Sequence, residues 1–120
     1  MSVTRDQGSW IAPDVVFAGS AHIGSWSCIG YGSEPASQTD IGDDVEVGAF
    51  CVVSRGVRIE AGVVIDHYCR VGPDSTIGRN TRILYGAQVF DNVKVGDNCI
   101  IGGHLIDRTI VEDEVTYSGD

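Results

Sequence analysis

The amino-acid sequence predicts an all-β fold in which the chain winds into stacked triangular coils. The first observation is a composition rich in turn residues, since the 120-residue chain holds 16 glycines and 3 prolines. The second is that no apolar pattern with the helical period of about 3.6 residues is sustained along the chain. The third is a repeat of six residues, which predicts a short strand and a turn in every unit.

The six-residue repeat places a large apolar side chain at every sixth position, and only Pro35 departs from this rule. The position four residues further on is small or β-branched in most units. One large and one small inward side chain per unit suit a narrow triangular prism. Three units make one coil, so residues three units apart stack at roughly 4.8 Å. The large positions are Ile11, Phe17, Ile23, Ile29, Pro35, Ile41, Val47, Val53, Ile59, Ile65, Val71, Ile77, Ile83, Val89, Val95 and Ile101.

Taken in order along the chain, residues 1–10 are expected to be a lead-in and residues 11–120 a single domain of about five to six coils. The stretch GSEPASQTD, Gly32 to Asp40, is a degenerate unit that is expected to bulge as a loop without changing the phase. After Ile101 the phase is lost, and it resumes at Val111, four residues late. Residues 102–110 are therefore expected to form a short excursion.

Three cysteines, Cys51, Cys69 and Cys99, occupy the small inward position. Cys51 and Cys69 lie one coil apart, which makes a disulfide conceivable, but buried filler is the preferred interpretation. The sequence has no CxxC pair, and a zinc site built from cysteine is not expected.

One corner of the coils departs from turn chemistry. At the fourth position of each unit, two columns carry Gly, Asp or Asn, which tolerate a left-handed backbone. The third column instead carries bulky rings, and departures of this kind tend to mark functional sites. Exposed rings are also ordinary at subunit interfaces, so an interface stays open as an alternative. The fourth positions of this column are Phe50, Tyr68, Gly86 and His104, and its third positions are Tyr31, Ala49, His67, Tyr85 and Gly103.

The charge balance excludes some classes of function. With 17 acidic and 8 basic residues the formal net charge is -9, which argues against nucleic-acid binding. No signal segment and no apolar run of about 18 residues occurs. We expect a cytoplasmic protein without a membrane-spanning segment.

The repeat resembles the hexapeptide-repeat, left-handed parallel β-helix family typified by bacterial acyltransferases, over about Ile11 to Ile101. The left hand is implied by the family. The run IDHYCRVG is similar to the catalytic segment of the sugar-nucleotide acyltransferases, in which aliphatic-x-His-Asp-Cys-x-aliphatic-Gly carries the general base. Tyr68 stands where that segment has Asp. The matching residues are Ile65, His67, Cys69, Val71 and Gly72.

The resemblance implies a homotrimeric acyltransferase with its active sites between subunits and no metal. It would transfer an acyl group to an amino or hydroxyl group of a sugar or nucleotide-sugar.

 The acyl donor that the resemblance implies is acetyl-CoA, with an imidazole as the general base.

The residues expected to carry this chemistry lie on the ring-bearing corner and in the units after it. His67 is the preferred general base, and His104 is the competing candidate. Contacts to the sugar are expected from a carboxylate and three rings: Asp66, Tyr68, Tyr85 and Phe50. The path of the pantetheine arm is expected along three glycines: Gly86, Gly102 and Gly103.

Two other functions remain open from the residues alone. The first is a non-catalytic trimeric β-helix module. The second is a metalloenzyme similar to the γ-class carbonic anhydrases, which share this fold and bind zinc through three histidines between subunits. That class needs a second histidine at a fixed spacing from the later ligand, and His104 has no partner there.

Overall fold

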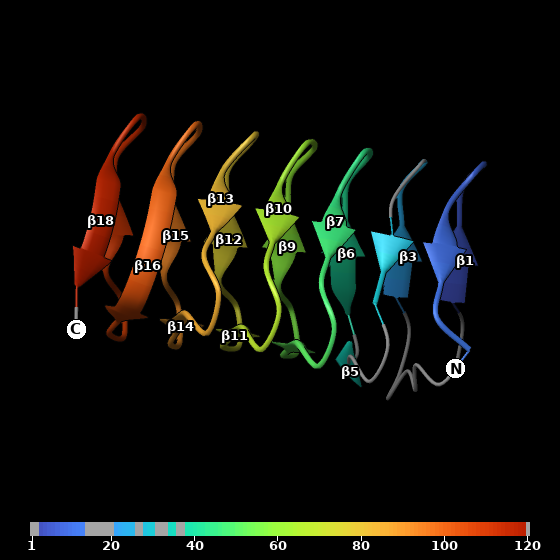
Figure 1. Ribbon diagram of the computed structural model, residues 1–120, viewed down its shortest axis with the longest axis horizontal. Coiled ribbons are helices and arrows are strands. Elements are labelled where there is room, and N and C mark those ends of the chain that lie inside the picture. Colours follow the sequence, from blue (N-terminus) through green and yellow to red (C-terminus); the bar gives the residue numbers. More distant parts are fainter. Residues whose placement is uncertain (1–2, 14–20, 26–27, 31–33, 36–37, 120) are drawn as a thin grey trace.

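The computed structural model describes residues 3–13, 21–25, 28–30, 34–35 and 38–119, which form short strands joined by turns, without a helix. The strands pair in parallel, coil upon coil, so the expected parallel β-helix is confirmed. The stack is elongated, with extents of 33 × 21 × 20 Å, and β1 and β18 lie at its opposite ends (Figure 1). The described residues contain no helix with the length and apolarity that a membrane span requires.

Three faces make up the prism, and most strands are only two residues long. The first face is formed by β1 (Val3–Arg5), β3 (Ala21–Ile23), β6 (Thr39–Ile41), β9 (Arg58–Ile59), β12 (Thr76–Ile77), β15 (Lys94–Val95) and β17 (Ile110–Val111). The second is formed by β2 (Trp10–Ile11), β4 (Cys28–Ile29), β7 (Glu46–Val47), β10 (Val64–Ile65), β13 (Arg82–Ile83), the start of β16 (Ile100–Leu105) and β18 (Thr116–Gly119). The third is formed by β5 (Glu34–Pro35), β8 (Val52–Val53), β11 (Arg70–Val71), β14 (Gln88–Val89) and the end of β16.

The number of coils differs slightly from the expected five to six, because the first face stacks seven strands. Its first strand, β1, pairs with β3 and lies within the ten residues that were expected as a lead-in. The difference arises because β1 joins the first face before the aliphatic repeat begins at Ile11.

The core is a set of aliphatic ladders that follow the repeat. On the first face Ile23, Ile41, Ile59 and Ile77 stack in register and are at most 1% exposed. Burying one such side chain contributes roughly 1.5–3 kcal/mol relative to leaving it in water. Because each coil covers the one before it, the ladder provides both the core and the alignment of the strands.

The small inward position has a second task in addition to filling space. The Ser75 hydroxyl donates to the carbonyl of Phe90 at 2.8 Å, and the Thr81 hydroxyl to that of Gly96 at 2.8 Å. Three buried free cysteines make equivalent bonds through their thiols, each of 3.0 Å: Cys51 to Asp66, Cys69 to Leu84, and Cys99 to Glu112. These cysteines are therefore buried filler, as expected, and also bind one coil to the next.

The two expected irregularities take different forms. The first, at residues 32–40, lies partly outside the described residues, and the part that is described keeps its register, because Pro35 pairs with Val53. Tyr31 and Phe17 also lie outside the described residues.

The second irregularity is a shortened coil. β16 runs through the corner as one strand, so that Ile83 pairs with Ile101 while Val89 pairs with Leu105. The corner that takes four residues in the coil below, 84–87, takes only Gly102 and Gly103 here. The phase change after Ile101 is therefore a loss of two residues, and no chain loops out as an excursion.

Candidate active site at one corner of the coils

The corner between the second and third faces is the one that carries rings in place of turn residues. We call it the aromatic corner and define it as residues 48–50, 66–68 and 84–86. Phe50 and Tyr68 have φ angles of 57° and 61°, in the left-handed region. A residue other than glycine costs roughly 1–2 kcal/mol there. The equivalent positions of the other corners hold Asp, Asn or Gly, which adopt the left-handed region at lower cost. Examples are Asp44, Gly62 and Asn80.

The rings of the aromatic corner form a ladder on the outside of the coils. Phe50 and Tyr68 stack with centroids 5.4 Å apart and planes inclined by 13°. Tyr68 meets Tyr85 edge-on at 5.5 Å. The three side chains are 53%, 54% and 64% exposed, respectively. Backbone strain and ring exposure together are typical of a surface kept for contact with another molecule.

His67 is fixed in this corner by the coil below. The backbone N–H of Ala49 donates to Nδ1 of His67 at 2.7 Å. A backbone N–H can only donate, so Nδ1 is the acceptor and the neutral ring carries its proton on Nε2. Gly48 makes this approach possible, because a Cβ there would lie 2.7 Å from Nδ1.

The same bond occurs at other corners with a carboxylate in place of the imidazole. Oδ1 of an aspartate accepts from the backbone N–H one coil below at distances of 2.8 to 3.0 Å. The aspartates are Asp43, Asp97, Asp107 and Asp113. This structural role of position 67 was not predicted, although Asp at the third position of several other units was a signal for it.

Asp66 precedes His67 and turns back onto it. Its Oδ1 accepts from the backbone N–H of His67 at 2.8 Å. A groove of about 350 Å³ follows the corner on the side of the second face, and Glu46, Gly48, Asp66 and His67 are among its lining residues. The structure thus brings Asp66, His67 and the ring ladder to one corner.

Tyr85 and Gly86 lie at the last full coil of the aromatic corner. The N–H of Gly86 donates to the carbonyl of His67 at 3.1 Å, whereas the N–H of Tyr85 has no acceptor among the described residues. A Cβ added at Gly86 would meet nothing within 4 Å. One coil further on, the corner is shortened to Gly102 and Gly103, so it does not cover Tyr85 and Gly86. We call the open surface at Tyr85 and Gly86 the ledge.

His104 lies apart from this corner. The six-residue count placed His104 at the fourth position of its unit, in the turn. Because the coil is shortened, His104 lies instead on the third face, where it pairs with Gln88. Its exposed ring lies 6.2 Å from the ring of Phe90, and no hydrogen bond joins its ring nitrogens to any described residue. Both nitrogens are therefore open to an external partner.

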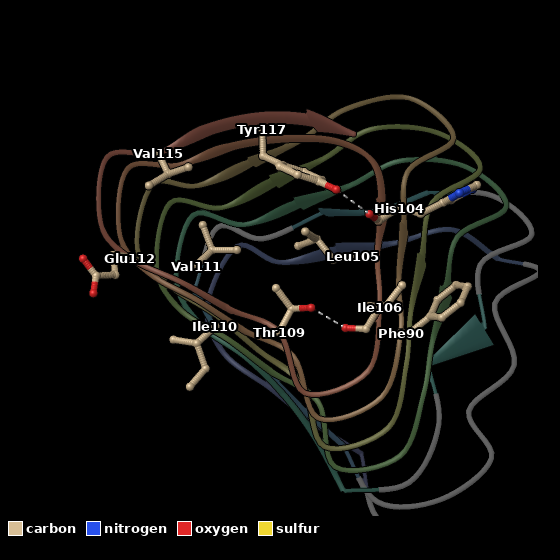
Figure 2. Close-up of a pocket in the computed structure, with 10 residues that line it drawn as sticks. All are labelled: Phe90, His104, Leu105, Ile106, Thr109, Ile110, Val111, Glu112, Val115 and Tyr117. Carbon is tan, nitrogen blue, oxygen red and sulfur yellow. Dashed lines mark hydrogen bonds between the residues drawn. The ribbon is translucent and has the colours of Figure 1, made fainter. Parts of the chain in front are cut away.

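A second and larger cavity, of about 660 Å³, opens at the end of the stack beyond the last coil (Figure 2). Leu105, Val111 and Val115 point into it, and the Tyr117 hydroxyl reaches across to the carbonyl of His104 at 3.3 Å. This cavity lies on the end of the last coil that the described residues form.

No group of three His, Cys, Asp or Glu side chains is placed to hold a metal ion within the described part of the chain. The His67 ring lies at the aromatic corner and the His104 ring on the third face, in different coils.

Comparisons with known proteins agree with this architecture. Residues 56–91 match the family model described as bacterial transferase hexapeptide (six repeats). UDP-3-O-acylglucosamine N-acyltransferase from Albidiferax ferrireducens is 32% identical over 94 residues, which cover 75% of this chain and 27% of that protein. The bifunctional protein GlmU from Acidithiobacillus ferrooxidans is 33% identical over 81 residues, which cover 68% of this chain and 17% of that protein.

Among solved structures, the acetyltransferase domain of PglB from Neisseria gonorrhoeae, in complex with acetyl coenzyme A, superimposes with a TM-score of 0.88. The sequences are 18% identical, and the match covers 92% of this chain and 54% of that one. The likeness supports the fold, and the chain spans well under two thirds of these relatives. The repeat, the parallel coils and the family match together place this chain in the bacterial hexapeptide-repeat transferase family.

Proposed function

We propose that this chain is an acyltransferase that moves an acetyl group from acetyl-CoA to an amino or hydroxyl group of a sugar or nucleotide-sugar. The relative from Albidiferax ferrireducens is named for N-acyl transfer to a UDP-linked sugar, and the PglB domain was solved with acetyl coenzyme A. The observation that carries the proposal is the aromatic corner, where strained rings, a fixed imidazole and an open ledge meet.

The reaction needs a base and an oxyanion donor. The acceptor nitrogen or oxygen attacks the thioester carbonyl, a base takes the proton of the nucleophile, and the C–S bond breaks to release the coenzyme thiol, which recovers that proton. The Tyr85 N–H, which has no acceptor among the described residues, suits the developing oxyanion. Gly86, Gly102 and Gly103 suit the path of the pantetheine arm, because they leave the ledge open.

Two histidines were expected as candidates for the base. The lone pair of Nδ1 in His67 is occupied by the Ala49 N–H. The ring of His104 makes no hydrogen bond to a described residue, but His104 lies apart from the aromatic corner, so it stays the competing candidate for the base beside His67. Phe50, Tyr68, Tyr85 and Asp66 then serve as contacts to the acceptor.

We further propose a homotrimer in which each active site lies between subunits. The exposed ring ladder supports this arrangement, because aromatic side chains are enriched at interfaces. A neighbouring subunit placed along the aromatic corner would close the groove beside His67 and bring a second surface to the ledge at Gly86.

Calorimetry with acetyl-CoA tests the proposal. We expect saturable binding to the wild-type chain, loss of binding in Gly86→Trp, and unchanged binding in Asn98→Trp. The control places the same ring at an exposed, left-handed position of another corner, where φ is 57°. With acceptors screened for turnover, the variant that removes the base, either His67→Ala or His104→Ala, should lower kcat by about 10²–10⁴. If the wild-type chain binds no acetyl-CoA at millimolar concentration, the chain is a non-catalytic module.

A further inference from the structure

Two of the buried thiols are neighbours inside the prism. Cys51 and Cys69 occupy equivalent positions of adjacent coils, because the residues that follow them, Val52 and Arg70, pair in register. Strands paired in this way lie roughly 4.8 Å apart, and a disulfide spans Cα separations of about 4.4–6.8 Å. We propose that Cys51 and Cys69 are the site of a disulfide, which a peroxide forms and which ties the two coils together.

The two sulfurs contact each other as well as the backbone. Each thiol donates to a carbonyl of the next coil at 3.0 Å, Cys51 to Asp66 and Cys69 to Leu84. The side chains of Cys51 and Cys69 are also joined to each other by a hydrogen bond. Because the sulfurs already lie next to each other, the disulfide requires rotation of the two side chains and no change in the register of the coils.

Cys99 provides a comparison within the same molecule. It is equally buried, at 1% exposed, and its thiol donates to the carbonyl of Glu112 at 3.0 Å. In its column the residue one coil below is Thr81, whose hydroxyl accepts from the backbone N–H of Cys99 at 3.2 Å. Cys99 therefore shares the burial and the backbone bond of the pair, but its neighbour in the stack carries a hydroxyl in place of a thiol.

The hydrogen bond between the thiols makes them unequal in acidity. A donor stabilises a neighbouring thiolate, so the bond from Cys69 lowers the pKa of Cys51. The same bond raises the pKa of Cys69, which keeps its proton. Because the thiolate is the nucleophile, Cys51 is the sulfur that attacks the oxidant and Cys69 is the thiol that resolves the product.

The oxidation proceeds in two steps. The Cys51 thiolate attacks one oxygen of the peroxide, the O–O bond breaks, and Cys51 becomes a sulfenic acid while the released hydroxide takes up the Cys51 proton to form water. Cys69 then attacks the sulfenic sulfur, so that the S–S bond forms, the S–O bond breaks, and the proton of Cys69 leaves in a second water. Two thiols and one hydrogen peroxide thus give one disulfide and two waters.

Burial determines how the oxidant reaches the pair. Both side chains are 1% exposed, so the peroxide enters when a coil opens locally. The strands that follow the cysteines, β8 and β11, are each only two residues long. A local opening leaves the rest of the two coils stacked, so Cys51 is expected to link to Cys69 and not to Cys99.

Treatment of the folded chain with hydrogen peroxide at neutral pH tests the proposal, in a Cys28→Ser background that removes the fourth cysteine. Mass spectrometry should show the loss of two hydrogen atoms, and peptide mapping should link Cys51 to Cys69 while Cys99 stays a free thiol. Because the link restricts the unfolded chain, the equilibrium constant for unfolding in urea should be about 10²-fold smaller than that of the reduced chain. Dithiothreitol should reverse both effects.

Two variants serve as controls. Cys69→Ser retains a donor for the carbonyl of Leu84, as Ser75 does for that of Phe90, so the fold should be kept. This variant should show neither the loss of hydrogen nor the gain in stability. Cys99→Ser should form the disulfide as readily as the background does.

Three results would overturn the proposal. The first is that Cys51 and Cys69 remain free thiols after the treatment. The second is a mixture in which links to Cys99 are as frequent as the link between Cys51 and Cys69, because that would show reaction in the unfolded chain. The third is a linked chain that is no more stable than the reduced one. The test uses neither acetyl-CoA nor an acceptor, so its outcome is independent of the proposed function.

Discussion

A substitution at a corner residue can lower the free energy of unfolding in two separable ways, through strain in the left-handed backbone and through steric overlap with the next coil. Gly86 isolates the first of these, because its φ is 69° and a Cβ would meet nothing within 4 Å. We expect Gly86→Ala to lower the free energy of unfolding by about 1 kcal/mol. Gly86→Asn should cost less, because asparagine tolerates the left-handed region. Urea denaturation of the three proteins measures both values, and equal losses in Ala and Asn would contradict this explanation.

The buried thiols also act at the scale of residues. Hydrogen bonding with Cys51, followed by burial, raises the pKa of the Cys69 thiol. In the unfolded chain a thiol titrates near about 8.5, so above that pH the unfolded state gives up its proton more readily than the folded state. The free energy of unfolding should therefore fall as the pH rises past about 8.5.

Denaturation at a series of alkaline pH values tests this effect, with Cys69→Ser as the matched control. Serine retains a small donor for the carbonyl of Leu84, as Ser75 does for Phe90. The variant should lose part of the alkaline slope without losing the fold. An identical slope in wild type and Cys69→Ser would show that other groups cause it.

At the scale of the element, the close contact between coils limits which residues can begin a corner. A Cβ on Gly78 would meet the carbonyl carbon and oxygen of Gly96 in the next coil, and would come close to Asp97. These atoms belong to a paired backbone that cannot move without breaking β12 from β15. We expect Gly78→Ala to destabilise the chain by about 3 kcal/mol. Gly86→Ala is the control of equal size, and a similar loss in both would contradict the contact.

The regular elements were predictable because one period governs them. Every described strand from β7 to β15 falls at the aliphatic positions of the hexad, so the inward residues such as Ile59 and Val89 followed directly from the sequence. The coil after Ile101 was not predictable in the same way. A phase that resumes four residues late is equally a phase that resumes two residues early, and only strand pairing distinguishes the two.

Because of that ambiguity, only the residues of the candidate site that precede the shortened coil could be assigned to the right corner from the sequence. Asp66, Tyr68, Phe50 and Tyr85 lie before the shortened coil, and they meet at the corner that counting assigned to them. His104 lies after it, and its column was wrong. The bond from Ala49 to His67 was missed, although the aspartates at the third position of other units were a signal that a side chain there accepts from the backbone of the coil below.

For the whole molecule, stability is expected to be a sum over neighbouring coils. A residue such as Val53 has a coil on both sides and is 1% exposed, whereas Val111 has a coil on one side only and is 9% exposed. In a stacked repeat the terminal units are held by one interface, so they open first. The cavity bordered by Leu105, Val111 and Val115 lies on the side of the last described coil that no other described coil covers (Figure 2).

The same deletion at these two positions tests this view of the molecule. Val53→Ala should cost about 2 kcal/mol, because the cavity it leaves is enclosed by two coils, and Val111→Ala should cost less than half as much. Hydrogen exchange should show the amides of β17 and β18 exchanging before those of β9 to β12 in the wild-type chain. Equal costs and uniform protection would mean that the last coil is covered in solution, and the cavity would then be an interface with another molecule. Repeating the exchange at lower protein concentration separates the two cases, because protection supplied by a second copy falls on dilution, whereas protection within one chain does not.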